Sequence, residues 1–233
     1  MSNHLSKQFD NDLEALRSQV LQMGGLVESQ VRGAIQAFSQ GNLSLADQIV
    51  ETEVRVDRFE MDIDSDCSQI IARRQPAASD LRLIMAVTKT VTDLERIGDE
   101  AHKIARMTKQ IHERGAADLS RFANLRHTAD AALNMLRRSL DAFARLDVKV
   151  AEQIILDDRV IDLEFKSVVR QLITFMMEDP RTISTSIDII WIAKAIERIG
   201  DHAKNICEDV IYIVHGTDVR HAKPNASEAN TLG

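Results

Sequence analysis

Apolar residues recur every three or four positions along most of the chain, and two long stretches show this pattern most clearly. Each stretch places its apolar residues on one side of a helix with a 3.6-residue repeat, which is typical of amphipathic helices that pack side by side. The first row of positions is Ile84, Val87, Val91, Leu94, Gly98, Ala101 and Ala105, and the second is Ile189, Ile192, Ile196, Gly200, Ala203, Ile206 and Val210.

Residues that end helices divide the chain into six segments. Glycine at or beyond a C-terminus and proline just after it are the expected stop signals, and Ser79 is the expected N-cap of the third segment. Gly24-Gly25 interrupts the first segment, and we expect one continuous helix there. The predicted helices span about residues 5–41, 43–74, 79–114, 120–145, 148–178 and 182–214.

Two pairs of similar segments reveal an internal repeat. LERIGD at 94–99 returns as IERIGD at 196–201, a separation of 102 residues, and LADQIV at 45–50 resembles VAEQII at 150–155, a separation of 105. This period is far longer than that of solenoid repeats, so it indicates a duplicated domain. The predicted fold is therefore all-α, with two tandem three-helix bundles at 1–115 and 116–216. A polar tail at 217–233 is expected to be disordered.

Composition narrows the class of protein further. Glycine and proline together account for 12 of 233 residues and aromatic residues for 4%, which argues against an all-β fold. The net charge of −7 offers no cationic surface for nucleic acid. We see no signal peptide and no membrane-length apolar run, and the distant cysteines Cys67 and Cys207 fit reduced thiols, so a cytoplasmic protein is expected.

Pairs of acidic residues spaced four apart lie beside the apolar rows, and they are the candidate site. Like charges at this spacing disfavour an isolated helix, yet the pair recurs at equivalent positions of the repeat. If neighbouring helices turned these rows together, the carboxylates would need protonation, basic partners or a bound cation. The alternative is a solvated charged face. The candidate ligands are Glu95 with Asp99, Glu197 with Asp201, Glu60 with Asp64, and Glu164.

Other residues near these pairs carry weaker signals. Gly98 and Gly200 cost helix stability, and either close helix packing or backbone access to a ligand would explain them. His102 and His202 are expected to be surface residues, since neither has a second histidine at helical spacing. The sequence has no glycine-rich phosphate loop, GxSxG or HExxH motif, so it predicts no catalytic residues.

The motifs Glu95-Arg96-Ile97-Gly98-Asp99 and Glu197-Arg198-Ile199-Gly200-Asp201 resemble the paired acidic motifs of the PhoU phosphate-signalling family. The segments at 72–82 and 177–183 resemble that family's inter-helix connections. The resemblance implies a cytoplasmic, homodimeric regulator that represses the phosphate-starvation response and links a phosphate ABC transporter ATPase to a membrane sensor histidine kinase. It also implies iron, zinc or another divalent metal at the acidic motifs, and contact with the membrane only through partners.

Two functional hypotheses follow from these observations. The first is a non-enzymatic adaptor that modulates phosphate uptake and holds the kinase in its repressive state. The alternative is a metal-dependent carboxylate-cluster enzyme or a metal-buffering helical bundle. Substitution of Glu95 and Glu197 by glutamine separates them, because an enzyme would lose turnover whereas an adaptor would lose only binding or signalling.

Overall fold

The computed structural model describes residues 2–76, 78–115 and 123–219, which form six long helices. Their bounds are α1 Ser2–Gln40, α2 Leu43–Arg74, α3 Ala78–Glu113, α4 Ala123–Arg145, α5 Val148–Glu178 and α6 Ile183–His215, with a short 3₁₀ turn, η2, at Pro180–Thr182 before α6. The all-α prediction is confirmed. The expected disordered tail lies almost entirely outside the described residues.

The helix ends follow the local signals in most places. Asn42 and Asp147 cap α2 and α5 in the same way: each side chain accepts a hydrogen bond from the backbone N–H three residues on, at 3.1 Å. Gly216 ends α6 with a φ of 71°, a conformation that favours glycine. α1 runs unbroken through Gly24-Gly25, as predicted. The prediction for Ser79 is wrong: it lies inside α3, where its hydroxyl contacts the Asp80 carboxylate.

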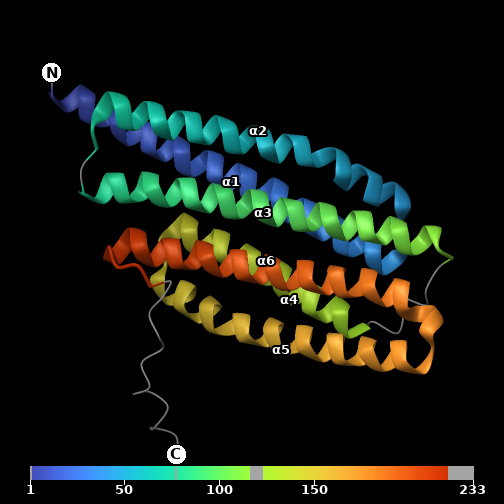
Figure 1. Ribbon diagram of the computed structural model, residues 1–233. Coiled ribbons are helices and arrows are strands. Elements are labelled where there is room, and N and C mark those ends of the chain that lie inside the picture. The colour runs from blue at the N-terminus through green and yellow to red at the C-terminus, as the bar shows by residue number, and fades with distance from the viewer. Residues whose placement is uncertain (1, 77, 116–122, 220–233) are drawn as a thin grey trace, which may run out of the picture.

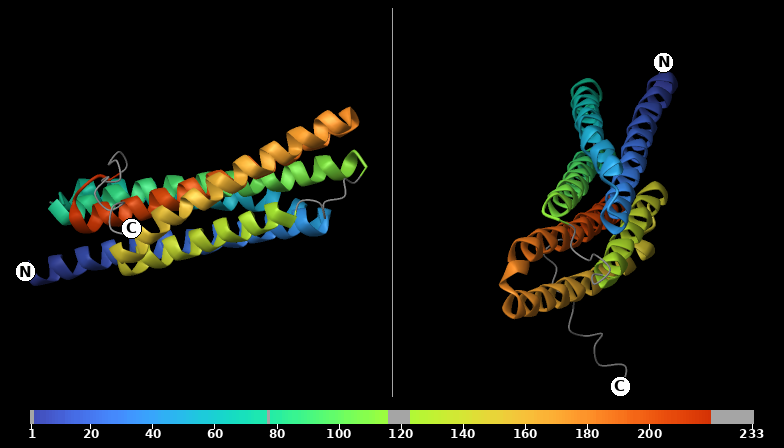
Figure 2. Two further views of the ribbon diagram at one scale, coloured as in Figure 1. Left: turned by 90° about the horizontal axis from the view of Figure 1, so that it is seen from below. Right: turned by 90° about the vertical axis from the view of Figure 1, so that its right-hand side faces the viewer.

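The two bundles, α1–α3 and α4–α6, lie against each other through α3 and α6 (Figures 1 and 2). The paired residues Asp93 with His202, Glu100 with Arg198, and Arg114 with Asp188 run in opposite directions along the two helices, so α3 and α6 are antiparallel. α1 also packs against α4. The connection between the bundles therefore involves two helices of each.

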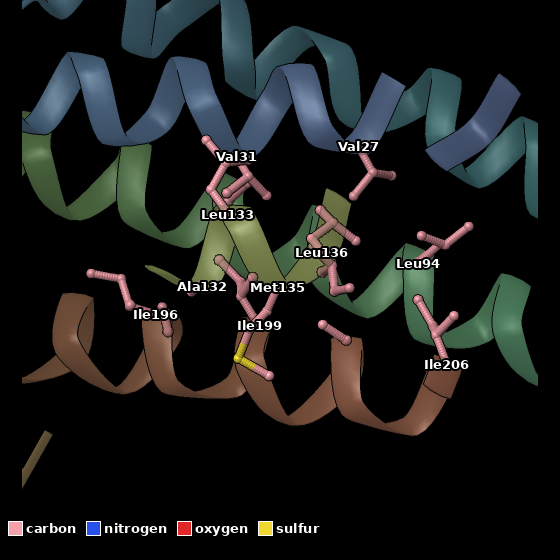
Figure 3. Packing of buried hydrophobic residues seen from close by; sticks show 14 of the residues in the cluster. Val27, Val31, Leu94, Ala132, Leu133, Met135, Leu136, Ile196, Ile199 and Ile206 are labelled. Carbon is pink, nitrogen blue, oxygen red and sulfur yellow. The ribbon is translucent and has the colours of Figure 1, made fainter. Parts of the chain in front are cut away.

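The hydrophobic core continues from one bundle into the other. Figure 3 shows side chains of α1, α3, α4 and α6 converging, among them Val31, Leu94, Leu136 and Ile199, all of which have no exposed surface. Helices this long are unstable alone and depend on this packing. Among the described residues, no helix combines the length and hydropathy that a membrane span requires.

Candidate functional site: two acidic clusters and the interface between the bundles

The first acidic cluster lies between α2 and α3. It consists of Asp57, Glu60 and Asp64 on α2, together with Glu95 and Asp99 on α3. Burial raises the pKa of Glu95 to about 7, and the negative charges of Asp99, Glu60 and Asp57 add to the rise. Burial and the charges of Asp64, Asp57 and Asp99 likewise raise the pKa of Glu60. The structure therefore brings together four of the predicted residues and adds Asp57.

The second acidic cluster, at the equivalent place between α5 and α6, consists of Asp158, Asp162, Glu197 and Asp201. Burial raises the pKa of Asp201, and the charges of Glu197 and Asp158 act in the same direction. The predicted pair Glu197 and Asp201 is thus joined by two aspartates of α5.

Glu164 does not join the second cluster. It is exposed and lines a cavity of about 320 Å³ between α4 and α5, beside Asn124 and His127. The repeat separation of 105 explains this, because it aligns Glu60 with Phe165 and leaves Glu164 one position away. One residue is a rotation of about 100° around a helix, which turns the carboxylate to another side.

The two clusters differ in how their charge is balanced. In the second, the Lys204 ammonium lies 3.0 Å from the Asp158 carboxylate, and Lys194 pairs with Glu197. Among the residues that the structure describes, no salt bridge reaches the five carboxylates of the first cluster. His102, at the position equivalent to Lys204, instead lies against Glu53, the equivalent of Asp158. The negative charge of the first cluster is therefore less balanced by nearby cations than that of the second cluster.

The fit of a metal to these clusters can be judged from the ligand geometry. All the carboxylates supply oxygen atoms, the ligands that hard cations prefer. Within the described ranges, however, no three His, Cys, Asp or Glu side chains are grouped so as to hold a metal ion. The first cluster is a crowded acidic surface without a formed coordination shell, so metal binding stays a prediction.

Gly98 and Gly200 are explained by close helix packing. A Cβ on Gly98 would lie 3.3 Å from the Gln30 amide oxygen, and one on Gly200 would lie 3.1 Å from the Ile161 Cδ1 atom. Gly98 is buried against both α1 and α2, where Val56 Cγ1 would lie 3.4 Å from the added Cβ, and Gly200 is buried against α5. Because these glycines have no side chain, the two helices that carry the carboxylates of each cluster can approach each other closely.

Replacing Gly200 by leucine should lower the free energy of unfolding by about 1–3 kcal/mol, because α5 would have to move away. Gly25 is the matched control, since a Cβ there meets nothing within 4 Å. Gly25→Ala should therefore raise stability by up to about 1 kcal/mol through helix propensity. Urea denaturation followed by circular dichroism measures both, and equal effects of the two substitutions would contradict the packing explanation.

Replacing Glu95 by glutamine should remove part of the pH dependence of stability. The pKa of Glu95 is about 7 in the folded chain, whereas the ordinary pKa of a glutamate side chain is 4.5. Between these values the folded state holds a proton that the unfolded state has released, so stability falls as pH rises from about 4.5 to 7 and stays lower above that. Glu95→Gln should be more stable than the parent at pH 8, by less than about 1 kcal/mol because solvent screens this partly exposed site.

Urea denaturation across that pH range measures the effect, and Glu152→Gln, at an exposed position outside both clusters, is the control. The same pH profile for parent and Glu95→Gln would show that the cluster does not crowd Glu95 in solution.

A buried polar network links α3 and α6 between the two clusters. Nδ1 of His202 lies 2.7 Å from Asp93 Oδ1, and the Asn205 amide donates to the same oxygen at 3.0 Å. Arg198 pairs with Glu100 at 2.9 Å. The expectation that His202 is a surface residue is wrong, because only 6% of it is exposed. Its partner lies 109 positions away, and helical spacing gives no signal for such a pair.

A cavity of about 360 Å³ opens beside this network, where α2, α3 and α6 meet. Its lining includes Asp64 of the first cluster, Asp93 and Asn205 of the network, and the cations Lys89 and Arg96. The first acidic cluster and the interface between the bundles are therefore neighbours across one hollow.

Comparisons with known proteins agree with this architecture. The family described as "PhoU domain" matches residues 20–108 and 125–210, one match in each repeat. The chain is 50% identical over 221 residues to the "Phosphate-specific transport system accessory protein PhoU homolog" of Pseudomonas putida, covering 95% of this chain and 86% of that protein. It is 44% identical to the PhoU accessory protein of Escherichia coli, covering 95% and 91%.

Solved structures show the same fold. The crystal structure of PhoU from Pseudomonas aeruginosa superposes with a TM-score of 0.87 at 48% identity, covering 90% of this chain and all of that one. A phosphate transport system regulatory protein PhoU from Streptococcus pneumoniae gives a TM-score of 0.83 at 27% identity, with 91% and 99% covered. With two family matches that occupy most of the length and relatives near 50% identity, the chain belongs to the PhoU family.

Proposed function

We propose that this protein is a non-enzymatic regulator of phosphate transport that represses the phosphate-starvation response when phosphate is plentiful. The observation that carries the proposal is identity of 44–50% over nearly the whole chain to accessory proteins of phosphate-specific transport systems. In this role the protein is a cytoplasmic adaptor between a phosphate ABC transporter ATPase and a membrane sensor histidine kinase. It reaches the membrane only through these partners.

The shape of the molecule supports an adaptor. α3, with 36 residues, is about 54 Å long, and each bundle presents its own outer helix faces, so two partners can bind at once. An adaptor shifts its partners only if it binds one of their conformations more tightly than another. The hydrogen-bonded α3–α6 interface holds the two bundles in a defined arrangement, which such selective binding requires.

Deletion of the gene tests the proposal directly. We expect alkaline phosphatase activity and phosphate uptake to rise in phosphate-rich medium, and the intact gene on a plasmid to restore repression. Normal repression in the deletion strain would contradict the regulatory role. Phosphohydrolase turnover by the purified protein that disappears in the Glu95→Gln, Glu197→Gln double variant would favour the enzymatic alternative.

Metal binding at the acidic motifs is proposed with a difference between the repeats. Lysines already balance part of the negative charge of the second cluster. Binding of a divalent cation should therefore depend mainly on the carboxylates of the first cluster. Elemental analysis of protein purified without a chelating tag should show bound iron, zinc or another divalent metal. That metal should be lost in Glu95→Gln with Asp99→Asn and largely kept in Glu197→Gln with Asp201→Asn. Absence of stoichiometric metal in the parent protein would contradict this proposal and leave the adaptor role standing.

A further inference from the structure

The outer face of α5 carries exposed apolar residues that the fold does not use. Leu156, Val160 and Leu163 are 53%, 59% and 64% exposed. Their spacing of four and three residues places them in one row along the helix. A row with this spacing is what a second helix packs against. We call these three residues the α5 stripe.

Comparison with the first repeat shows that the bundle does not need this row. At the separation of 105 residues, the α5 stripe corresponds to Glu51, Arg55 and Arg58 on α2, which are all charged and exposed. Both repeats fold into a three-helix bundle, and α2 and α5 have equivalent N-caps. An apolar row at these three positions is therefore particular to the second repeat, because the exposed apolar residues Val54 and Met61 of α2 lie at other positions.

The position of α5 leaves the stripe open. Among the described elements, α5 packs against α4, α6 and the η2 turn, and it lies at the edge of the molecule away from α1–α3 (Figures 1 and 2). The buried side of α5, with Ile154, Ile161 and Val168, faces its own bundle. The stripe faces outward, where a partner can reach it, and Val160 also lines the cavity between α4 and α5.

Basic residues border the stripe on one side only. Arg159, Lys166 and Arg170 are exposed and spaced seven and four residues apart, so they follow the same flank of the helix. Within the described part of the chain, the structure records no ion pair for any of them. Unpaired cations along an apolar row in a protein of net charge −7 favour a partner surface that is both apolar and acidic.

We propose that the α5 stripe is a docking surface for an amphipathic helix of the phosphate transport system, whose apolar row is flanked by Asp or Glu facing Arg159, Lys166 and Arg170. This rests on the proposed function, which supplies the transporter as the partner. A helix is favoured over an anionic lipid surface because one acidic row of a helix can face Arg159, Lys166 and Arg170 alone. A lipid surface would lie along the whole of α5 and would also meet its exposed carboxylates Glu152, Glu164 and Glu178. The binding mode is that of a helix whose apolar side chains at i, i+4 and i+7 meet a complementary row.

The test measures binding of the full-length protein to the phosphate ABC transporter in phosphatidylcholine nanodiscs. Val160→Glu with Leu163→Glu should weaken binding about tenfold or more, because it places charges in the centre of the contact. Val54→Glu on α2 is the matched control, as Val54 is 63% exposed, and it should bind like the parent. Arg159→Glu with Lys166→Glu should also weaken binding and reduce its dependence on salt.

The remaining outcomes overturn the proposal in distinguishable ways. Equal binding by the stripe variant and the parent, or equal loss with Val54→Glu, removes the stripe as the contact while the transporter role stands. Parent protein that does not bind transporter discs contradicts both the partner and the proposed function. A dimer that dissociates only in the stripe variant, seen by sedimentation, shows a contact between two copies instead. Stripe-dependent binding to empty discs containing phosphatidylglycerol shows a lipid contact. Thermal melting confirms that each variant is folded.

Discussion

Asp93→Ala should lower the free energy of unfolding by about 2–4 kcal/mol, because it removes a buried carboxylate that accepts two hydrogen bonds. Asp93 is only 8% exposed, and its Oδ1 atom accepts hydrogen bonds from the side chains of both His202 and Asn205. Without the carboxylate, the buried imidazole of His202 and the half-buried amide of Asn205 would each lose their hydrogen-bond acceptor between α3 and α6. Urea denaturation followed by circular dichroism measures the loss.

Two further variants separate this mechanism from a general packing defect. Asp93→Asn keeps an acceptor oxygen and should cost less than the alanine substitution. In a double-mutant cycle, Asp93→Ala and His202→Ala should be non-additive by about 0.5–3 kcal/mol, because each removes the same contact. A loss below about 1 kcal/mol for Asp93→Ala, or additive effects, would show that the two bundles are not held together by this pair.

Phe143→Ala should be comparably destabilising, by about 3–5 kcal/mol, because it leaves a large cavity in a fully buried part of the core. Phe38 occupies the equivalent position of the first repeat, 105 residues earlier, and is 4% exposed. Phe38→Ala should therefore have a similar effect. Val54→Ala, at a 63% exposed position, is the control and should change stability by no more than about 0.5 kcal/mol.

The same pair of variants tests whether the two bundles unfold as one unit. The chain has a single tryptophan, Trp191, in α6 of the second bundle, and the Lys103 ammonium of α3 lies 5.2 Å from the centre of its ring. Its fluorescence therefore reports on the second bundle and on the contact of that bundle with α3. Because the core joins α1, α3, α4 and α6 (Figure 3), Phe38→Ala should shift the Trp191 transition as far as the transition by circular dichroism. A Trp191 transition that moves only with Phe143→Ala would show that the bundles unfold independently.

Much of the fold could be predicted from the sequence because its signals are local. The apolar rows, the caps and the helix-ending glycines act within a few residues, so the six helices followed from them. The acidic pairs Glu95–Asp99 and Glu197–Asp201 were also visible, since a spacing of four fixes two residues on one side of a helix. Even here Ser79 was misplaced, since α3 already begins at Ala78 and a local pattern defines a helix end only to within one or two residues.

The charge balance of the candidate site was not visible in the same way. That Lys204 balances Asp158 in the second cluster, whereas the first has no such lysine, depends on how α5 and α6 pack. The internal repeat, however, does indicate which acidic residues of α5 belong to the second cluster. Alignment at a separation of 105 matches Asp57 with Asp162 and moves Glu164 out of register with Glu60. Glu164 was predicted as a ligand because it is an acidic residue of the equivalent helix. It stands one position away from the equivalent of Glu60, and that rotation turns its side chain away from the second cluster.

The sequence by itself determined the helices, their duplication and the rows of acidic and apolar residues on each, because these depend on the period of a single helix. Only the tertiary structure decided that Asp93 meets His202, that lysines form salt bridges with the second acidic cluster but, among the described residues, not with the first, and that the apolar row of α5 faces outward. These three features depend on how helices that are far apart in the chain are rotated and how closely they approach each other. No local sequence pattern fixes that geometry, because it results from many weak packing contacts acting together.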